Sequence, residues 1–269
     1  AHPAVVDGSG ATITASFDLN GRLAGAWNVV VTNPTGAAAT LPNGFTIGST
    51  AVAGNSGLDL TWSACNRSGA PGTDDRAFDC GDPNGVNTLY GNFQLARQMP
   101  GFVALDAVID IVLAGAGVPP FWQYAGGGCN AAGIAVSDAR PESECPIALN
   151  ANPWGIGGGA SDAVITGYAP GLGGPGRARL LVTVARSSSN PITLEGGLNY
   201  FGFGLHVVTD NAAVCGGCAT PALITWSEAA FYSVTAGIAP VVATEPGLRA
   251  KSVTVNGGLG RMAIGSVAP

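Results

Sequence analysis

The chain has 269 residues, of which 46% are hydrophobic and only 10% are charged, and its formal net charge is −6. This length is enough for one large or two modest domains, each with its own core. Nucleic-acid binding requires clustered basic side chains. The densest basic spot is Arg177 with Arg179, so we expect no nucleic-acid partner. The low charge also weakens repulsion between copies of the chain.

The pattern of glycines indicates an all-β protein. The 42 glycines and 18 prolines follow no collagen-like repeat, and they separate short runs rich in β-branched residues, which is typical of turns between strands. The longest apolar run, residues 101–122, is broken by Asp106, Asp110 and two prolines, so we expect no membrane span. The sequence opens at Ala1 without a signal peptide, which predicts a processed, mature chain.

The first 48 residues read as short strands at Thr12–Phe17, Trp27–Thr32 and Phe45–Ile47, with turns at residues 33–36 and 42–44. The strings GAWNVVVTNPTG and LPNGFTI resemble the closing half of an IPT/TIG immunoglobulin-like domain. The resemblance implies a small β-sandwich of the kind found on extracellular proteins. Its opening strands are missing from residues 1–48. Another segment is therefore expected to complete the unit, or the unit is built differently.

After a linker at residues 49–57, the main domain is expected over residues 58–235. The clearest strand is residues 103–113, where aliphatic residues alternate with Asp106 and Asp110. A helix would also place these aspartates on one face, but the β-branched content favours a strand. Further strands are predicted at Leu58–Trp62, Leu180–Val184, Tyr200–Val208 and, as a strand pair, residues 221–235. This domain weakly resembles the jelly-roll or cohesin-like sandwiches of secreted bacterial proteins.

The last part of the chain is predicted to be a strand or hairpin tail, residues 249–269, behind a second linker at residues 236–248. Asn256 and Gly257 lie between apolar runs, which is a strong hairpin signal. An isolated hairpin is only marginally stable, so the tail should dock on its own chain or on the next copy. Docking on the next copy would join subunits by strand exchange.

Six cysteines indicate an oxidising, extracellular compartment. Of the possible connectivities, the sequential one closes the shortest loops and is the expected one: Cys65–Cys80, Cys129–Cys145 and Cys215–Cys218. The sequence Cys215-Gly-Gly-Cys218 could also be a redox motif or half of a zinc site. We favour a disulfide in a turn, because no second such motif exists and a strand follows.

Three groups of residues are candidates for binding. An acidic loop around Cys80 could bind calcium or could simply be solvated, since its spacing matches no fixed motif; it contains Asp74, Asp75, Asp79, Asp82 and Asn84. The aromatic residues Trp122, Tyr124 and Trp154 lie in glycine-rich segments and either stack on a polysaccharide or fill the core. Asn66 begins a glycosylation acceptor sequence.

Catalytic residues are not predicted. His206 is the one internal histidine and His2 is near the amino terminus, and no nucleophile elbow accompanies either of them. Glu142, Glu144 and Glu195 leave a glycoside hydrolase as a remote alternative, because that reaction needs two carboxylates facing one sugar. No cofactor is predicted apart from the possible calcium.

The sequence therefore predicts an all-β extracellular protein with two alternative roles. The first is a structural subunit of a filament, sheath or surface layer, held by β-strand contacts between copies. The second is a carbohydrate-binding or adhesive module of a secreted or cell-surface protein. Exposed tryptophans on a concave sheet would favour the second role, and contacts between chain ends would favour the first.

Overall fold

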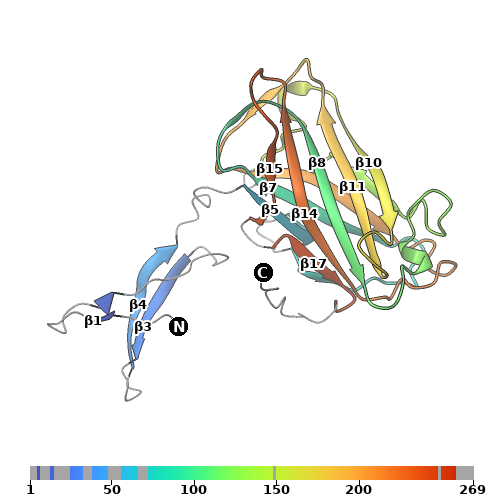
Figure 1. The fold of residues 1–269 in the computed structure, drawn as a ribbon, viewed down its shortest axis with the longest axis horizontal. Helices are drawn as coiled ribbons and strands as arrows, with labels where there is room; N and C mark the ends of the chain where they lie inside the picture. Colours follow the sequence, from blue (N-terminus) through green and yellow to red (C-terminus); the bar gives the residue numbers. More distant parts are fainter. Residues whose placement is uncertain are drawn as a thin grey trace. The chain divides into compact units, whose positions relative to one another are not determined.

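The computed structural model describes residues 5–6, 13–14, 25–32, 38–47, 56–65, 72–147, 150–247 and 250–258, and it divides the chain into two compact units, residues 1–49 and 50–269. Figure 1 shows that both units consist of strands, which confirms the predicted all-β class. In the described ranges, no helix is both long and apolar enough to cross a lipid bilayer.

The first unit contains two antiparallel pairs: β1 (Val5–Val6) with β2 (Ile13–Thr14), and β3 (Gly25–Thr32) with β4 (Ala38–Ile47). The strands predicted at Trp27–Thr32 and Phe45–Ile47 are confirmed. The predicted turn at residues 42–44 is wrong, because these residues lie inside β4 as a bulge: Trp27 pairs with Phe45, whereas Val29 pairs with Leu41. Bulges are positions where strands accommodate proline and glycine. The predicted turn at residues 33–36 lies outside the described residues.

The second unit is a sandwich of two sheets (Figure 1). The eight-stranded sheet has the order β10-β11-β8-β14-β17-β6, with β12 also paired to β8 and β15 to β14. Its strands are β6 (Asp75–Arg76), β8 (Met99–Leu113), β10 (Ser161–Pro170), β11 (Arg177–Arg186), β12 (Ile192–Leu194), β14 (Ala222–Ser233), β15 (Val241–Ala243) and β17 (Ser252–Val255).

The five-stranded sheet has the order β16-β5-β7-β13-β9. Its strands are β5 (Gly57–Trp62), β7 (Val86–Gln94), β9 (Ile134–Ser137), β13 (Asn199–Val208) and β16 (Glu245–Pro246). Two short 3₁₀ helices, η1 (Pro120–Trp122) and η2 (Ile156–Gly158), lie in the connections. The predicted strands at Leu58–Trp62, Leu180–Val184 and Tyr200–Val208 are confirmed.

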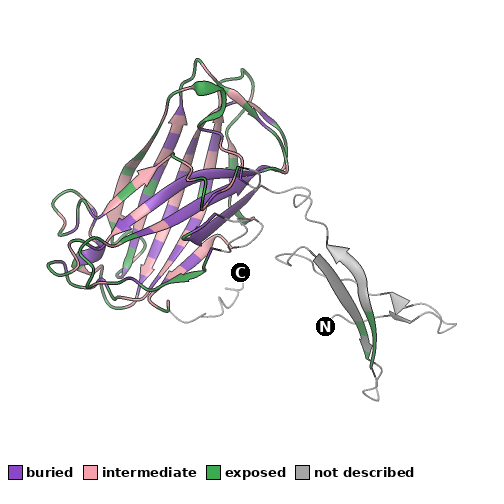
Figure 2. Ribbon diagram, turned by 180° about the vertical axis from the view of Figure 1, so that it is seen from behind, coloured by how far each residue is buried: buried purple, intermediate pink, exposed green. Residues whose placement is uncertain are grey.

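β8 is the central strand of the larger sheet, between β11 and β14. Its side chains alternate between the core and the outer surface: Leu105, Ile109 and Leu113 are buried, whereas Asp106 and Asp110 are half-buried on the other face. The strand interpretation of residues 103–113 is therefore confirmed. Figure 2 shows this alternation as bands of buried and intermediate residues along the strands of the sheet.

The predicted boundaries after residue 220 need correction. Residues 221–235 contain one twelve-residue strand, β14 (Ala222–Ser233), and not a strand pair. The predicted linker at residues 236–248 contains β15 and β16, which pair with β14 and β5. The sandwich therefore begins at Gly57 and extends beyond residue 235 to include β17.

The tail pairs within its own chain. β17 lies antiparallel to β14 and parallel to β6, and Val253 and Val255 are buried in the core. The carbonyl oxygen of Thr254 accepts a hydrogen bond of 2.9 Å from the indole of Trp62. Residues 252–255 are thus not a free donor strand, and strand exchange through them is wrong. Their β partners come from far along the chain, which local hydrophobicity could not reveal.

All six cysteines form disulfides, but the predicted sequential pairing is wrong. The bonds are Cys65–Cys145, Cys80–Cys218 and Cys129–Cys215. Cys215 is bonded to Cys129 and Cys218 to Cys80. The turn that contains both cysteines is therefore linked to two segments that are distant in the sequence. Gly217 in this turn has φ +101°, and a Cβ atom there would lie 2.3 Å from Cβ of Pro119. Sequence proximity alone does not show which loops meet at one end of a sandwich.

Candidate functional site

The two sheets differ in what covers their outer faces. In the five-stranded sheet, the side chains that alternate with the core residues Leu58 and Leu60 are also buried. They include Asp59 and Asn92, both fully buried, and Tyr90, which is 5% exposed. Figure 2 shows this sheet buried on most of its strands. Both faces of the five-stranded sheet are therefore occupied.

One segment on this side of the sheet is a loop that we call the strap, residues 138–147. It leaves β9 beside β13 and reaches the end of β5, where the amide of Cys65 donates a 2.9 Å hydrogen bond to the carbonyl oxygen of Glu144. The Cys65–Cys145 disulfide fixes it there. The chain then returns to β13, where Ala151 pairs with Tyr200. Since β7 lies between β5 and β13, the strap crosses the sheet.

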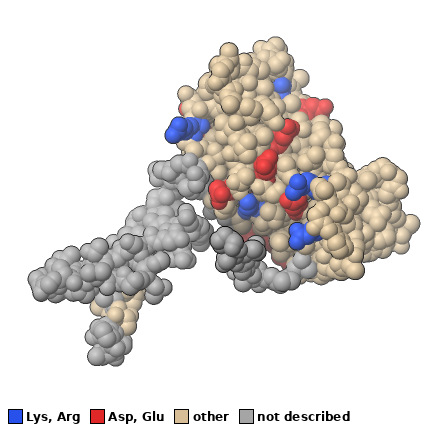
Figure 3. Space-filling model, viewed as in Figure 1, with Lys and Arg blue, Asp and Glu red and all other residues tan. Residues whose placement is uncertain are grey.

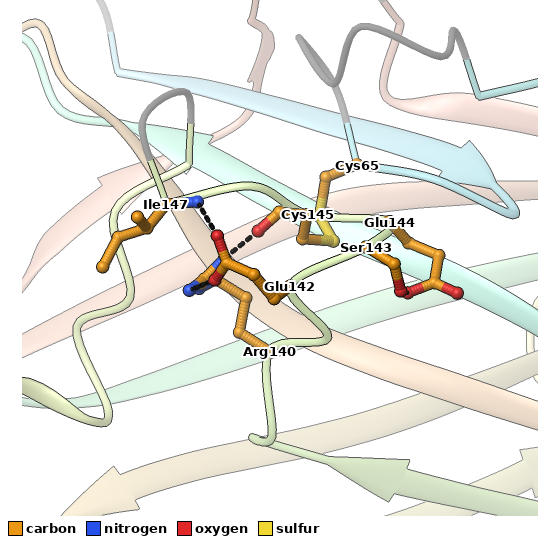
Figure 4. Close-up of polar contacts among 7 residues, drawn as sticks. All are labelled: Cys65, Arg140, Glu142, Ser143, Glu144, Cys145 and Ile147. Atoms are coloured by element: carbon orange, nitrogen blue, oxygen red, sulfur yellow. Dashed lines mark hydrogen bonds and ion pairs between the residues drawn. A yellow bond between two sulfur atoms is a disulfide. The ribbon is translucent and has the colours of Figure 1, made fainter.

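Arg140 holds the strap in shape (Figure 4). Its side chain is 7% exposed and donates hydrogen bonds to the carbonyl oxygen of Cys145 and to the carboxylate of Glu142. The other oxygen of Glu142 accepts a hydrogen bond from the amide of Ile147 at 3.1 Å. The Ile147 amide and then the Arg140 guanidinium lower the pKa of Glu142. Glu142 is thus part of the strap's own bonding.

The other carboxylates considered for glycoside hydrolysis are also bonded to their surroundings. Glu144 accepts a hydrogen bond from the hydroxyl of Ser143 in the strap, and Glu195 accepts bonds of 3.0 Å from the side-chain amide of Gln98. Neither carboxylate lines the hollow beside Asp106 and Leu181 or the one beside Arg97 and Val242. These contacts give no support to a pair of catalytic carboxylates among these three residues.

The outer face of the eight-stranded sheet, in contrast, is uncovered (Figures 1 and 3). We use the name outer face for the outward side chains of β8, β10, β11 and β14. Two of its aliphatic residues are well exposed, Leu181 at 40% and Val164 at 50%. Charged groups on it are few and separated by uncharged surface, as Figure 3 shows. This is the one broad sheet surface of the described sandwich that is open to a partner.

Two charged groups of the outer face form an ion pair across neighbouring strands. Arg179 on β11 and Asp110 on β8 form a two-point ion pair of 2.7 and 3.1 Å. Partial burial alone would raise the pKa of Asp110. Hydrogen bonds from Arg179 and Ser227, with the nearby arginine charges, outweigh burial and lower this pKa. The pair therefore adds little net charge to the surface.

A shallow hollow of about 380 Å³ lies in the outer face. Its lining includes Asp106, Val108, Leu181, Thr183, Glu228 and Tyr232. Asp106 accepts a 2.6 Å hydrogen bond from Thr183. The hydrogen bond between Asp106 and Tyr232 is the main cause that raises the pKa of Tyr232. The hollow thus combines hydrogen-bonding groups with aliphatic contact surface, and it suits a polar or mixed partner.

The chain matches no protein-family model and no curated protein in these comparisons. Its function must therefore be argued from its own surfaces.

The aromatic candidates belong to the core, so sugar stacking by them is wrong. Trp122 and Trp154 are each 1% exposed and Tyr124 is 6% exposed. Trp154 donates a 2.8 Å hydrogen bond to the carbonyl oxygen of Gly202, and Trp122 donates one of 3.2 Å to that of Gly217. The glycine-rich segments around them bend over the ends of the sheets, which buries the rings instead of displaying them.

The acidic loop uses its carboxylates to fix turns. Asp79 accepts a hydrogen bond from the amide of Gly81 at 3.0 Å, and Asp82 accepts one from the amide of Asn84 at 2.9 Å. Asp75 accepts a 2.7 Å bond from the hydroxyl of Thr254. Across the described residues no group of three acidic, histidine or cysteine side chains could hold a metal. The calcium prediction for Asp74, Asp75, Asp79, Asp82 and Asn84 therefore gains no support.

Two candidates, His2 and Asn66, lie outside the described residues. His206 lies on β13, half-buried, with Nδ1 3.0 Å from the hydroxyl of Thr88. Burial lowers the pKa of His206. No carboxylate forms a hydrogen bond with it in the described part of the chain, so its surroundings suit a neutral imidazole that supports the sheet.

The depressed pKa of His206 predicts a pH-dependent stability. The unfolded state binds a proton near pH 6.5 and the folded state does so only at lower pH. The contribution of His206 is thus fully present above about pH 6.5 and is lost as the pH falls through its folded pKa. In urea unfolding between pH 7.5 and 5, His206→Gln should lose less stability than the wild type. Equal losses would contradict this assignment.

The sequence did not identify the outer face as a site. One signal was present: Asp106 and Asp110 alternate with buried residues in the central strand, which places both on the non-core face. Arg177 and Arg179, two residues apart, share a face of β11 for the same reason. What the sequence lacked was the register that sets Arg179 beside Asp110.

Proposed function

We propose that this protein is an extracellular structural protein whose copies contact one another, with the outer face of the eight-stranded sheet as a contact surface. The observation that carries the proposal is the difference between the two sheets. The outer side of the five-stranded sheet is buried, and the disulfide-bonded strap runs from its β9 edge to the end of β5, whereas the outer face is open and displays Val164 and Leu181. Exposed apolar groups that lie together indicate an interaction surface.

The chemistry of the outer face fits a protein surface as its partner. Protein interfaces are depleted of charge in their centre, and here the Arg179–Asp110 pair neutralises two of the few charges. The outer face also carries the small side chains Ala104, Ala185 and Ala230, which add little bulk where another surface would approach. The low overall charge of the chain reduces repulsion between copies. Three disulfides suit an extracellular setting.

A charge placed in the outer face should weaken this association. In Leu181→Glu, the new carboxylate would face the hollow that Asp106 and Glu228 already line, so docking would bury an unpaired negative charge. We expect self-association of the full chain, measured by sedimentation, to weaken at least ~10-fold, or about 1.4 kcal/mol. Val214→Glu, at a loop position that is 83% exposed, is the matched control. Equal association of both variants and the wild type would refute the role of the outer face.

The hollow also supports a second candidate function, a polysaccharide-binding module. Asp106, Glu228 and Tyr232 line it, and carboxylate and hydroxyl groups can hydrogen-bond sugar hydroxyls. The same variants separate the two functions. A full chain that stays monomeric but binds soluble polysaccharide, with binding lost in Leu181→Glu and kept in Val214→Glu, would favour the module over the structural subunit.

A further inference from the structure

A hollow of about 520 Å³ lies along the free edge of β15, and we call it the edge groove. It touches five successive residues, Val241 to Glu245, which include all of β15. Successive side chains of a strand point to opposite faces of the sheet. A hollow that touches all of them therefore lies along the edge of the strand and not over one face. On its other edge β15 pairs with β14, and it pairs with no further strand of the described chain.

The opposite wall of the edge groove is the turn between β7 and β8, residues 95–100. Aliphatic surface comes from this turn, from Ile238 and from Val242, which is 56% exposed. Arg97 and Glu245 contribute one charge of each sign to the lining. An added strand binds through its main chain and places alternate side chains in pockets. A groove with unpaired backbone and balanced charges thus suits an extended, uncharged peptide segment.

The chain itself contains a segment of this kind after β17. We call it the donor segment, residues 259–269; it lies outside the described residues, and its sequence is LGRMAIGSVAP. Arg261 is its one charged residue. From Met262 onward it is uncharged and contains Ile264 and Val267, which are β-branched residues that favour strands. Its composition therefore matches the edge groove.

The edge groove and the start of the donor segment lie toward opposite ends of β14. β15 pairs with β14 at Phe231, whereas β17, which precedes the donor segment, pairs with it as far as Ala222 (Figure 1). These two residues are nine positions apart, which corresponds to about 30 Å along a strand. A segment that leaves one end and a groove toward the other end can join copies head to tail. Contacts of this type repeat into rings or open fibres.

We propose that the donor segment of one copy occupies the edge groove of the next copy as a strand added to β15. β17 stays in its own sheet, so only the residues that follow it are exchanged. This inference rests on the proposed self-association. It adds to the outer face a second contact, which gives the assembly a direction.

Mixed cysteine variants test the contact in the full chain. Val242→Cys is placed in one copy and Ile264→Cys in another, so that a disulfide between the new thiols can form only between copies. We expect a covalent heterodimer under oxidising conditions. Its mass spectrum should join the β15 peptide to the donor-segment peptide, with the native disulfides unchanged. Val214→Cys, at a loop position that is 83% exposed, replaces Val242→Cys in the matched control. A yield no higher than in this control would overturn the proposal.

The alternative occupant of the edge groove is the donor segment of the same chain. The double variant Val242→Cys/Ile264→Cys separates the two cases by dilution. A disulfide between copies should become rarer as the protein is diluted, as the proposal requires. A disulfide that forms within single chains with a yield independent of concentration would overturn it.

A charge in the donor segment tests the contact without new thiols. Ile264→Glu would bury an unpaired carboxylate in the edge groove, so it should weaken sedimentation-measured self-association at least ~10-fold, and Val214→Glu should not. If Leu181→Glu weakens association while Ile264→Glu behaves like Val214→Glu, the edge groove contact is wrong and the proposed function stands. If only Ile264→Glu weakens association, the edge groove contact stands and the role of the outer face fails. A wild type that remains monomeric at every concentration would overturn both.

Discussion

Deleting residues 250–269 is expected to unfold the sandwich domain and not to release an intact monomer. β17 is enclosed by β14 on one side and by β6 on the other. Its loss would open the core at Val253 and Val255 and would leave the Trp62 indole without its acceptor on Thr254. A tail that served only a neighbouring copy could be removed without this damage.

The expected loss of stability is comparable to the whole stability of a domain. Burial of two valines contributes about 1.5–3 kcal/mol each. The lost hydrogen bonds, which include those from Leu60 to Ala250 and from Trp226 to Lys251, contribute about 1 kcal/mol each. The sum, on the order of 5–10 kcal/mol, compares with about 5–15 kcal/mol for a typical domain. Circular dichroism and thermal unfolding would measure it.

The matched control is a shorter deletion, residues 259–269, which removes none of these contacts. It should keep the thermal transition of the wild type within a few degrees. A cooperative, native-like transition in the longer deletion would contradict the enclosed position of β17. It would restore the possibility that the tail serves another copy.

Elements whose signal is local could be predicted from the sequence. In β8 the alternation from Leu105 to Leu113 is set by burial on one face, and the same holds for the core residues of β11. The two-residue period of a strand is visible directly in the order of hydrophobic and polar residues. The class of the fold follows from several such strands separated by glycine-rich turns.

Elements whose signal depends on distant partners could not be predicted. Residues 236–248 contain proline and glycine and read as a linker, yet β15 and β16 form there because β14 and β5 offer free backbone groups. The tail is a similar case, since its partners β14 and β6 are separated from it by intervening chain. Local patterns in the sequence do not show which distant strands become neighbours.

The candidate site shows the same limit. Asp106 and Asp110 could be placed on the non-core face of their strand, but their partners Thr183 and Arg179 come from the register with β11. From the sequence, Trp122 and Trp154 were candidates for a surface site, but both are buried. A buried and an exposed tryptophan are indistinguishable in a glycine-rich segment, and only the complete core decides between them.

The second large expected effect is the loss of stability when a disulfide is removed. The observed bonds close separations of 80, 138 and 86 residues, whereas a sequential pairing would close short local loops. Longer loops restrict the unfolded chain more, so each bond is expected to contribute about 2–5 kcal/mol. Cys80–Cys218 closes the longest loop and joins the acidic loop to the turn after β13.

In Cys80→Ala/Cys218→Ala we expect a loss near the upper end of that range, measured by urea unfolding. Cys129→Ala/Cys215→Ala, which opens the 86-residue separation, is the matched control, and the logarithmic dependence on loop length predicts a loss only about 0.4 kcal/mol smaller. The number of free thiols decides the pairing independently of stability. The observed bonds leave no free thiol in either variant, because each removes both partners of one disulfide. If the sequential pairing were correct, the first variant would free Cys65 and Cys215, and alkylation followed by mass spectrometry would detect both.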